Sequence, residues 1–202
     1  MVEFEKSISA KDLTKDCIKF LNNDRVQGYL SKGDLFKVYR AMDFEIFDLL
    51  AGERGILTWF FYSIGIDVLK ELKTVPPAFL FKTPVIRCDI YNGIKSMGIY
   101  AFASSSIKEV KVPGTIDYIP TGCFQECDNL KTAILGDGVE EIESGAFSSI
   151  KSDAKIYIPD SVIAVNGYIF DDSPDIEVNC GSGSYIEDYC NRYKVKYKIK
   201  EK

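Results

Sequence analysis

Hydrophobic residues recur along the second half of the chain with a period of 22 or 23 residues. The most regular mark is one phenylalanine per unit, at Phe102, Phe124, Phe147 and Phe170. Phe79 lies 23 residues before Phe102 and opens an imperfect first unit. Self-similarity at a fixed period of this length is typical of stacked supersecondary units. We therefore expect a solenoid with a column of phenylalanines in its interior.

Within each unit, apolar residues alternate with polar ones over a short stretch, as in residues 107–112. Alternation of this kind predicts a strand with one inward face. Pro113, Gly136 and Pro159 follow these strands, where proline cannot continue a ladder and glycine permits a corner. A second extended segment, such as residues 139–142, precedes the phenylalanine. No unit can bury its apolar face alone, so the units must stack.

Residues between the inward positions should project outward and align between units. One predicted ladder contains Asp89, Lys111, Ile134, Tyr157 and Asn179, and its neighbour contains Arg87, Glu109, Thr132, Lys155 and Glu177. Ile134 and Tyr157 are the apolar members of a polar ladder, a pattern typical of an interface core within a polar rim. The candidate partner-binding residues of the solenoid are therefore Asp89, Lys111, Thr132, Ile134, Lys155, Tyr157 and Asn179.

The first part of the chain has a helical pattern. Ser9 and Asp12 resemble a capping box, and apolar residues follow at helical spacing. We expect a helical domain over residues 1–72 and a solenoid over 73–202 with a cap at about 184–202, which gives an α+β fold. The aromatic cluster around Trp59 and Tyr62 has two interpretations: burial against the open end of the solenoid, or an exposed partner-binding patch.

The amino-acid composition excludes several classes of function. The 202-residue chain has no histidine, which excludes Ser-His-Asp and Cys-His catalysis and histidine-bearing zinc sites. A formal net charge of −5 argues against nucleic acid as the primary ligand. No apolar run is long enough to span a membrane, and the first residues lack the apolar segment of a secretory signal. We expect a cytoplasmic, non-enzymatic protein that needs no cofactor or metal.

Six cysteines are present, and the cytoplasmic interpretation predicts free thiols. Cys123 occupies the position that Ala101 and Ala146 occupy in neighbouring units, which indicates packing as a small hydrophobe. The carboxylates Glu140, Glu141 and Glu143 are interpreted as a solvated edge rather than as a glycosidase pair, which would have to face across a cleft.

Charge is distributed unevenly. Residues 76–191 contain eight Lys or Arg and seventeen Asp or Glu, whereas residues 192–202 contain six basic residues and one acid. In this tail Lys194, Lys196, Lys198 and Lys200 alternate with Val195, Tyr197 and Ile199, so one face should pack and the other should carry lysines. The lysines either protect the edge of the last strand or form a basic contact surface.

Two phrases, Phe124-Gln125-Glu126-Cys127-Asp128-Asn129-Leu130 and Ile156-Tyr157-Ile158-Pro159-Asp160-Ser161-Val162, resemble the BspA-like leucine-rich repeat family. In that family an Ala-Phe pair is followed by a cysteine three positions on, then a leucine, then Ile-Pro-x-Ser-Val. Here the cysteine occurs once, at Cys127, and the Pro-x-Ser-Val phrase is clean only at residues 159–162. The resemblance covers about residues 76–200, and residues 181–197 resemble the closing cap of the family.

This resemblance implies a repeat scaffold that binds proteins and shares no catalytic residues. Members occur on cell surfaces, inside cells and in phages. We therefore expect a non-enzymatic protein-binding module that acts by occupying the surface of a partner protein. A phage-encoded inhibitor of a host defence protein is the narrower hypothesis, and a structural or adhesive surface repeat protein is the alternative.

Overall fold

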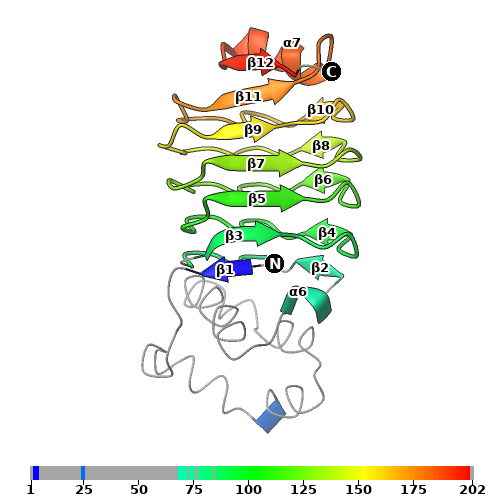
Figure 1. Ribbon diagram of the computed structural model, residues 1–202, viewed down its shortest axis with the longest axis vertical. Helices are drawn as coiled ribbons and strands as arrows, with labels where there is room; N and C mark the ends of the chain where they lie inside the picture. Colours follow the sequence, from blue (N-terminus) through cyan, green and yellow to red (C-terminus); the bar gives the residue numbers. More distant parts are fainter. Residues whose placement is uncertain are drawn as a thin grey trace.

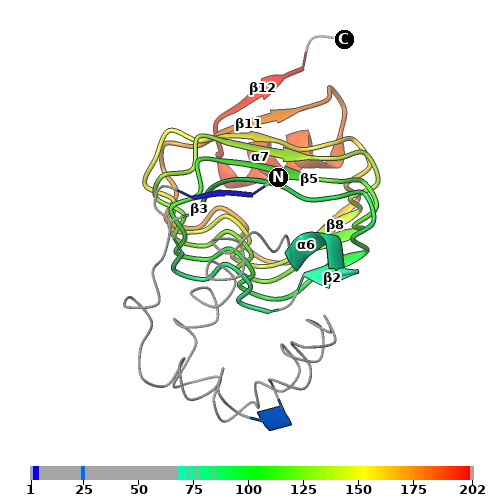
Figure 2. The ribbon, with the colours of Figure 1, turned by 60° about the horizontal axis from the view of Figure 1, so that its bottom comes forward.

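The computed structural model of the protein describes residues 2–4, 24–25, 68–71, 73–75, 77–83 and 85–200. From residue 73 onward the chain forms a β-solenoid whose turns stack along one axis (Figure 1). Successive turns follow nearly the same outline around a shared interior (Figure 2). The expected solenoid is therefore confirmed.

The first side of each turn contributes one strand to a seven-stranded sheet. Its order is β1 (Val2–Phe4), β3 (Val85–Asp89), β5 (Glu109–Val112), β7 (Thr132–Leu135), β9 (Lys155–Tyr157), β11 (Glu177–Cys180) and β12 (Tyr197–Ile199). All neighbours are parallel except β1, which pairs antiparallel with β3. We call the outward face of this sheet the strand face.

Strand β1 corrects one expectation. Residues 2–4 belong to the stretch predicted as helical, but they pair with β3 as an edge strand of the solenoid sheet. The physical reason is visible in Val2-Glu3-Phe4, which alternates apolar and polar residues as a strand does and covers the otherwise open edge of β3. Most of the predicted helical domain lies outside the described residues, as do Trp59 and Tyr62. Near its end, α6 (Val68–Glu71) is a single helical turn.

The second side of each turn is a two-residue strand. β2 (Thr74–Val75) pairs with β4 (Ser96–Met97), and β6 (Tyr118–Ile119), β8 (Glu141–Ile142) and β10 (Ala164–Val165) form a three-stranded sheet. All of these pairs are parallel. The inward residue of each of the first four strands, such as Met97 or Ile142, is buried, as its apolar character predicts.

The third side carries the phenylalanine and is joined to its neighbours by backbone hydrogen bonds. The amide of Phe124 donates to the carbonyl of Ala146 at 2.8 Å, and the amide of Phe147 donates to Ile169 at 2.9 Å. Two residues before Phe124 and before Phe147 the backbone takes a positive φ, 60° at Gly122 and 69° at Gly145, which favours glycine. A side chain at Gly122 would also collide with the ring of Tyr100, 2.2 Å from its Cβ.

The phenylalanines form the predicted column. Ring centroids of Phe102 and Phe124 lie 5.3 Å apart, those of Phe124 and Phe147 5.1 Å apart, and Phe170 follows 6.0 Å beyond Phe147. The first two pairs are stacked and the third is tilted, and aromatic contacts at such distances contribute beyond the burial of apolar area. The predicted inward strand residues are buried as well: Val85, Cys88, Ile90, Ile107, Val110, Val112, Leu130, Ala133, Leu135, Ala154, Ile156, Ile158, Ile176, Val178 and Cys180.

Small donors satisfy backbone groups between turns. Three residues after the phenylalanine, the Cys127 thiol donates to the carbonyl of Phe102 at 3.1 Å, and the Ser173 hydroxyl donates to the carbonyl of Phe147 at 2.9 Å. The Ser161 hydroxyl donates to the carbonyl of Val139 at 2.7 Å. Buried carbonyls need such partners, which explains why these repeat positions carry Cys or Ser.

The five described cysteines are buried free thiols, Cys88, Cys123, Cys127, Cys180 and Cys190. Burial raises the pKa of Cys127 and of Cys190 to about 12 and raises that of Cys123 well above its usual value. Their predicted burial is confirmed, and Cys17 lies outside the described residues.

Helix α7 (Tyr185–Tyr193) closes the solenoid, as the predicted cap requires. The Ser184 hydroxyl accepts a hydrogen bond from the amide of Glu187 at 3.2 Å, and the Glu187 carboxylate accepts one from the amide of Gly183 at 2.6 Å. The Ser184 bond is that of an N-cap, and the Glu187 carboxylate reaches the residue before the N-cap instead of the N-cap amide itself. The ring of Tyr189 meets Phe170 edge-on at 6.3 Å, so a tyrosine ends the phenylalanine column.

Candidate functional site

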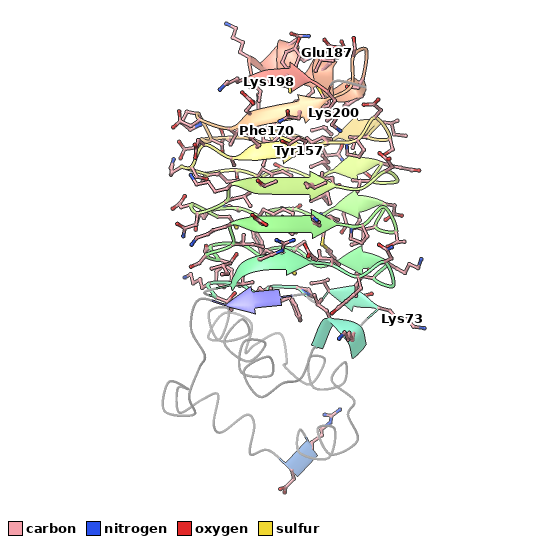
Figure 3. All side chains as sticks on the ribbon, in the orientation of Figure 1. Lys73, Tyr157, Phe170, Glu187, Lys198 and Lys200 are labelled. Atoms are coloured by element: carbon pink, nitrogen blue, oxygen red, sulfur yellow. The ribbon has the colours of Figure 1, made fainter. Side chains whose placement is uncertain are left out.

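The strand face brings the predicted ladder together. Register pairs join Asp89 to Lys111, Lys111 to Ile134, Ile134 to Tyr157, and Tyr157 to Asn179. Thr132 and Lys155 are paired in the neighbouring ladder. The predicted alignment of these seven residues is confirmed, and whether they bind a partner stays a prediction. Figure 3 shows Tyr157 on this face, at β9.

Ile134 and Tyr157 form the apolar centre of the strand face. Ile134 is 37% exposed although it lies mid-sheet, and Tyr157 is half-buried. Adjacent strands are about 4.8 Å apart, so two side chains paired in register can contact one molecule together. Neither residue belongs to the buried core. Stacking of the turns therefore does not explain them.

Arg87 neutralises acids at one end of the strand face. Its guanidinium lies 2.9 Å from the carboxylate of Glu109 and 3.3 Å from that of Asp89. Exposed pairs of this kind add little to stability. Their consequence is that Asp89, a predicted binding residue, is already engaged with a neighbour on its own strand.

Glu177 at the other end differs from its expected exposure. Its side chain is only 8% exposed, because the ammonium groups of Lys198 and Lys196 lie 3.0 Å and 3.1 Å from its carboxylate. Hydrogen bonds from Lys198 and then Lys196 lower the pKa of Glu177. The next tail lysine, Lys200, donates to the carbonyl of Ile158 at 2.7 Å. We call this arrangement the Glu177 clasp.

The clasp changes the interpretation of the tail. Three of its lysines hold β12 to the body of the solenoid, a role that the sequence analysis missed. Ile199, expected to pack, is 41% exposed. The sequence did contain a signal for the clasp: Glu177 stands in the predicted outward ladder of the last turn, and lysines follow it at alternate positions of the tail.

An acidic concavity lies on the side of the short strands. Asp117, Tyr118, Glu140, Glu141 and Glu143 line a space of about 350 Å³. The Asn166 amide donates to the carboxylates of Glu141 and Glu143, while burial, and next the charge of Glu143, raise the pKa of Tyr118. Asp117 comes from one turn, and Glu140, Glu141 and Glu143 come from the next. Across the described ranges, no group of three His, Cys, Asp or Glu is placed to hold a metal.

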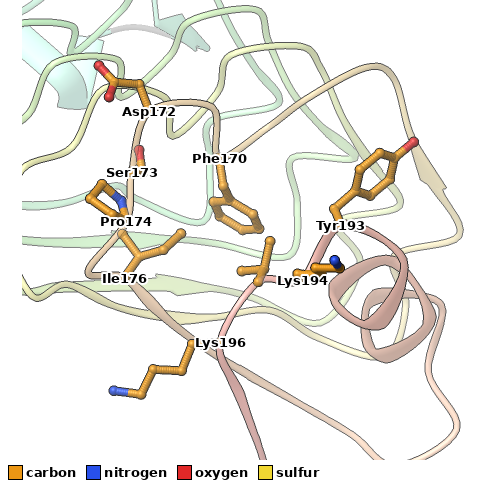
Figure 4. Close-up of a pocket in the computed structure, with 9 residues that line it drawn as sticks. Phe170, Asp172, Ser173, Pro174, Ile176, Tyr193, Lys194 and Lys196 are labelled. Atoms are coloured by element: carbon orange, nitrogen blue, oxygen red, sulfur yellow. The ribbon is translucent and has the colours of Figure 1, made fainter.

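A second concavity lies between the last turn and the cap (Figure 4). It encloses about 310 Å³, with Phe170 and Val195 among the apolar residues and Lys194 among the charged ones. Nearby, the ring of Tyr193 meets that of Tyr168, which is 63% exposed, at 5.4 Å. The repeat pattern gave no signal for this aromatic surface, because it depends on how the cap folds back.

Comparisons with known proteins identify the repeats. The profile of the "BspA type Leucine rich repeat region" matches six copies over residues 66–190. No curated protein matches the chain significantly. Among solved structures, the pneumococcal vaccine antigen PcpA is similar over 55% of this chain and 30% of its own length, with 21% identity and a TM-score of 0.39. In the described part of the chain, no helix has the length and apolar character needed to cross a membrane.

The matched region includes every turn of the described solenoid and part of its cap. Such repeats typically serve as non-enzymatic scaffolds for protein–protein contacts. The chain belongs to the BspA-type leucine-rich repeat family.

Proposed function

We propose that the chain is a non-enzymatic protein-binding module that acts by occupying the surface of a partner protein, with the strand face as its contact surface. The observation that carries this proposal is the pairing of Ile134 and Tyr157 at outward positions of adjacent strands. Interface cores are apolar and often contain tyrosine, and a few such residues dominate binding energy.

The two concavities support binding less well. Carboxylates dominate the acidic one, and interface centres are depleted of charge. At the cap, Lys196 is held by Glu177 and Asp172 by Lys151, so two of the charged groups around that concavity are engaged within the chain. The strand face spans several turns, and solenoids bind partners on extended surfaces of this kind.

The experiment compares two immobilised full-length baits, the wild type and the double variant Ile134→Ser with Tyr157→Ser. Each is exposed to lysate of the organism that carries the gene and, if that organism is a phage, of its host. The proposal expects at least one protein that the wild type retains and the double variant loses. A partner retained equally by both, but lost by a folded Trp59→Ala variant, would move the interface to the first part of the chain.

The narrower hypothesis is inhibition of a host defence protein by a phage-encoded chain, and it stays a prediction. The same capture would test it, because the retained protein would then be a host defence component whose activity falls when the chain is added.

A further inference from the structure

The strand face is positively charged although the solenoid is acidic. Residues 77–200 contain 13 basic and 17 acidic residues. The outward positions of the main sheet carry five basic residues, Arg87, Lys111, Lys155, Lys196 and Lys198, against four acidic ones, Glu3, Asp89, Glu109 and Glu177. This face therefore has a net charge of +1, and the remaining surface carries the negative charge.

Two of these cations, Lys111 and Lys155, lie beside the apolar centre and are not held by a carboxylate in the described part of the chain. Arg87 is paired with two acids, and Lys196 and Lys198 are held by Glu177. Lys111 and Lys155 are both exposed, and within the described residues neither side chain makes an ion pair or a hydrogen bond. The hydrogen bond from Lys131, and last the charge of Lys155, lower the pKa of Asp153, but neither Lys111 nor Lys155 is fixed in an ion pair, so both ammonium groups can contact a ligand.

The geometry places these lysines on opposite sides of Ile134. Lys111 is its register partner on β5, and Lys155 lies on β9, where Tyr157 pairs with Ile134. Two strand spacings and a two-residue offset put Lys111 and Lys155 roughly 12 Å apart at the backbone. An extended peptide projects residues i, i+2 and i+4 from one side and spans about 13 Å between the outer two.

We propose that the strand face binds an acidic segment in which an apolar residue stands between two carboxylates at i and i+4. This inference rests on the proposed function and names the chemistry of the partner. The apolar side chain contacts Ile134 and Tyr157, and the carboxylates pair with Lys111 and Lys155. Charge complementarity of this kind selects partners as well as accelerating association. A second copy of the chain would instead have to present its own acidic side.

The test uses a peptide probe and the isotope-labelled full-length chain. The probe is acetyl-Ser-Glu-Ser-Phe-Ser-Glu-Ser-amide, with Lys in place of both Glu as one control peptide and Ser in place of Phe as another. We expect saturable NMR shifts of β5, β7 and β9 amides with the probe. Either control peptide should bind at least tenfold more weakly, and raising the salt concentration should weaken binding of the probe.

Matched charge reversals locate the effect. Lys111→Glu with Lys155→Glu should weaken probe binding at least tenfold, whereas Lys73→Glu with Lys95→Glu, the same change of net charge at exposed residues beside β2 and β4, should leave it within twofold. Circular dichroism and thermal melts establish that both variants fold; if the strand-face reversal does not fold, Lys111→Gln with Lys155→Gln replaces it.

Four results would each overturn the proposal. The first two are equal binding of the lysine peptide and equal losses of probe affinity in both charge-reversal variants. The other two are an absence of saturable shifts and concentration-dependent self-association through β5, β7 and β9. The proposed function and this inference can fail separately. If binding of a captured partner requires Ile134 and Tyr157 but not Lys111 and Lys155, the strand face remains the contact surface and the acidic-segment proposal is wrong.

Discussion

Two columns of side chains run along the solenoid at the same pitch, and they follow opposite rules. Inside, every turn contributes a phenylalanine, and consecutive rings from Phe102 to Phe170 lie 5.1–6.0 Å apart. Outside, the strand face changes from Asp89 through Lys111, Ile134 and Tyr157 to Asn179. Stacking demands an identical interior, because each turn must accept its neighbours on both sides. The exterior carries no such demand and can specify a partner.

The largest effect that would test this contrast is the loss of an inner ring. Phe124→Ala and Phe147→Ala should each lower the free energy of unfolding by about 3–5 kcal/mol, since both rings are fully buried between neighbours. Chemical denaturation measures the change, with Lys111→Ala as the exposed control. Wild-type stability in either phenylalanine variant would place that ring outside the core and contradict the register.

A smaller effect should follow from the donors between turns. Cys127→Ala leaves the buried carbonyl of Phe102 without its thiol donor and should cost about 1–3 kcal/mol. Cys127→Ser should preserve most of the stability, because Ser173 makes the equivalent bond in another turn. Denaturation of the two variants side by side separates the hydrogen bond from the packing, and equal losses would reject the bond.

Thiol chemistry reports on the same interior. At neutral pH the buried cysteines should react slowly with a thiol reagent, because burial shields them and raises the pKa of Cys127 and Cys190 to about 12, which suppresses the thiolate. Denatured, unreduced protein should react at about six sites, the full cysteine count. A count near zero after denaturation would instead show disulfides.

The Glu177 clasp predicts a modest pH dependence of the cap. Because Lys198 and Lys196 lower the pKa of Glu177 in the folded state, the clasp stabilises fully above the usual glutamate pKa of about 4.3. That contribution is lost as the pH falls through the lowered value. Thermal melts of the wild type and of Glu177→Gln should therefore differ at neutral pH and converge in acid, and a constant difference would contradict the clasp.

The sequence predicts the fold where one residue repeats its role in every turn. The spacing of Phe79, Phe102, Phe124, Phe147 and Phe170 sufficed to predict the column, and alternation within each strand placed the ladder residues correctly. Features that occur only once in the molecule were not predicted from the repeat pattern. The pairing of β1 with β3 joins the start of the chain to the first turn, and the Glu177 clasp joins the last ladder position to lysines of the tail, so neither contact recurs in other turns.

The position of the candidate site could be predicted from the sequence, but the pairing of its charged side chains could not. Alternation placed Ile134 and Tyr157 side by side on the outward face. Side-chain geometry decides which charged groups form ion pairs. Arg87 reaches both Glu109 and Asp89. Lys111 lies next to Glu109 but forms no ion pair among the described residues. Sequence spacing cannot distinguish these cases, because all four residues occupy adjacent outward positions.

The most direct test measures stability and binding on one variant. Ile134→Ser with Tyr157→Ser should change the free energy of unfolding by less than about 1 kcal/mol per site, because both residues lie outside the buried core. Affinity for the captured partner should fall at least tenfold, since losing such anchors typically costs about 2 kcal/mol or more. That result would show that the outward residues of the strand face determine binding without determining the stability of the phenylalanine core. Unchanged affinity in a folded variant would contradict the account.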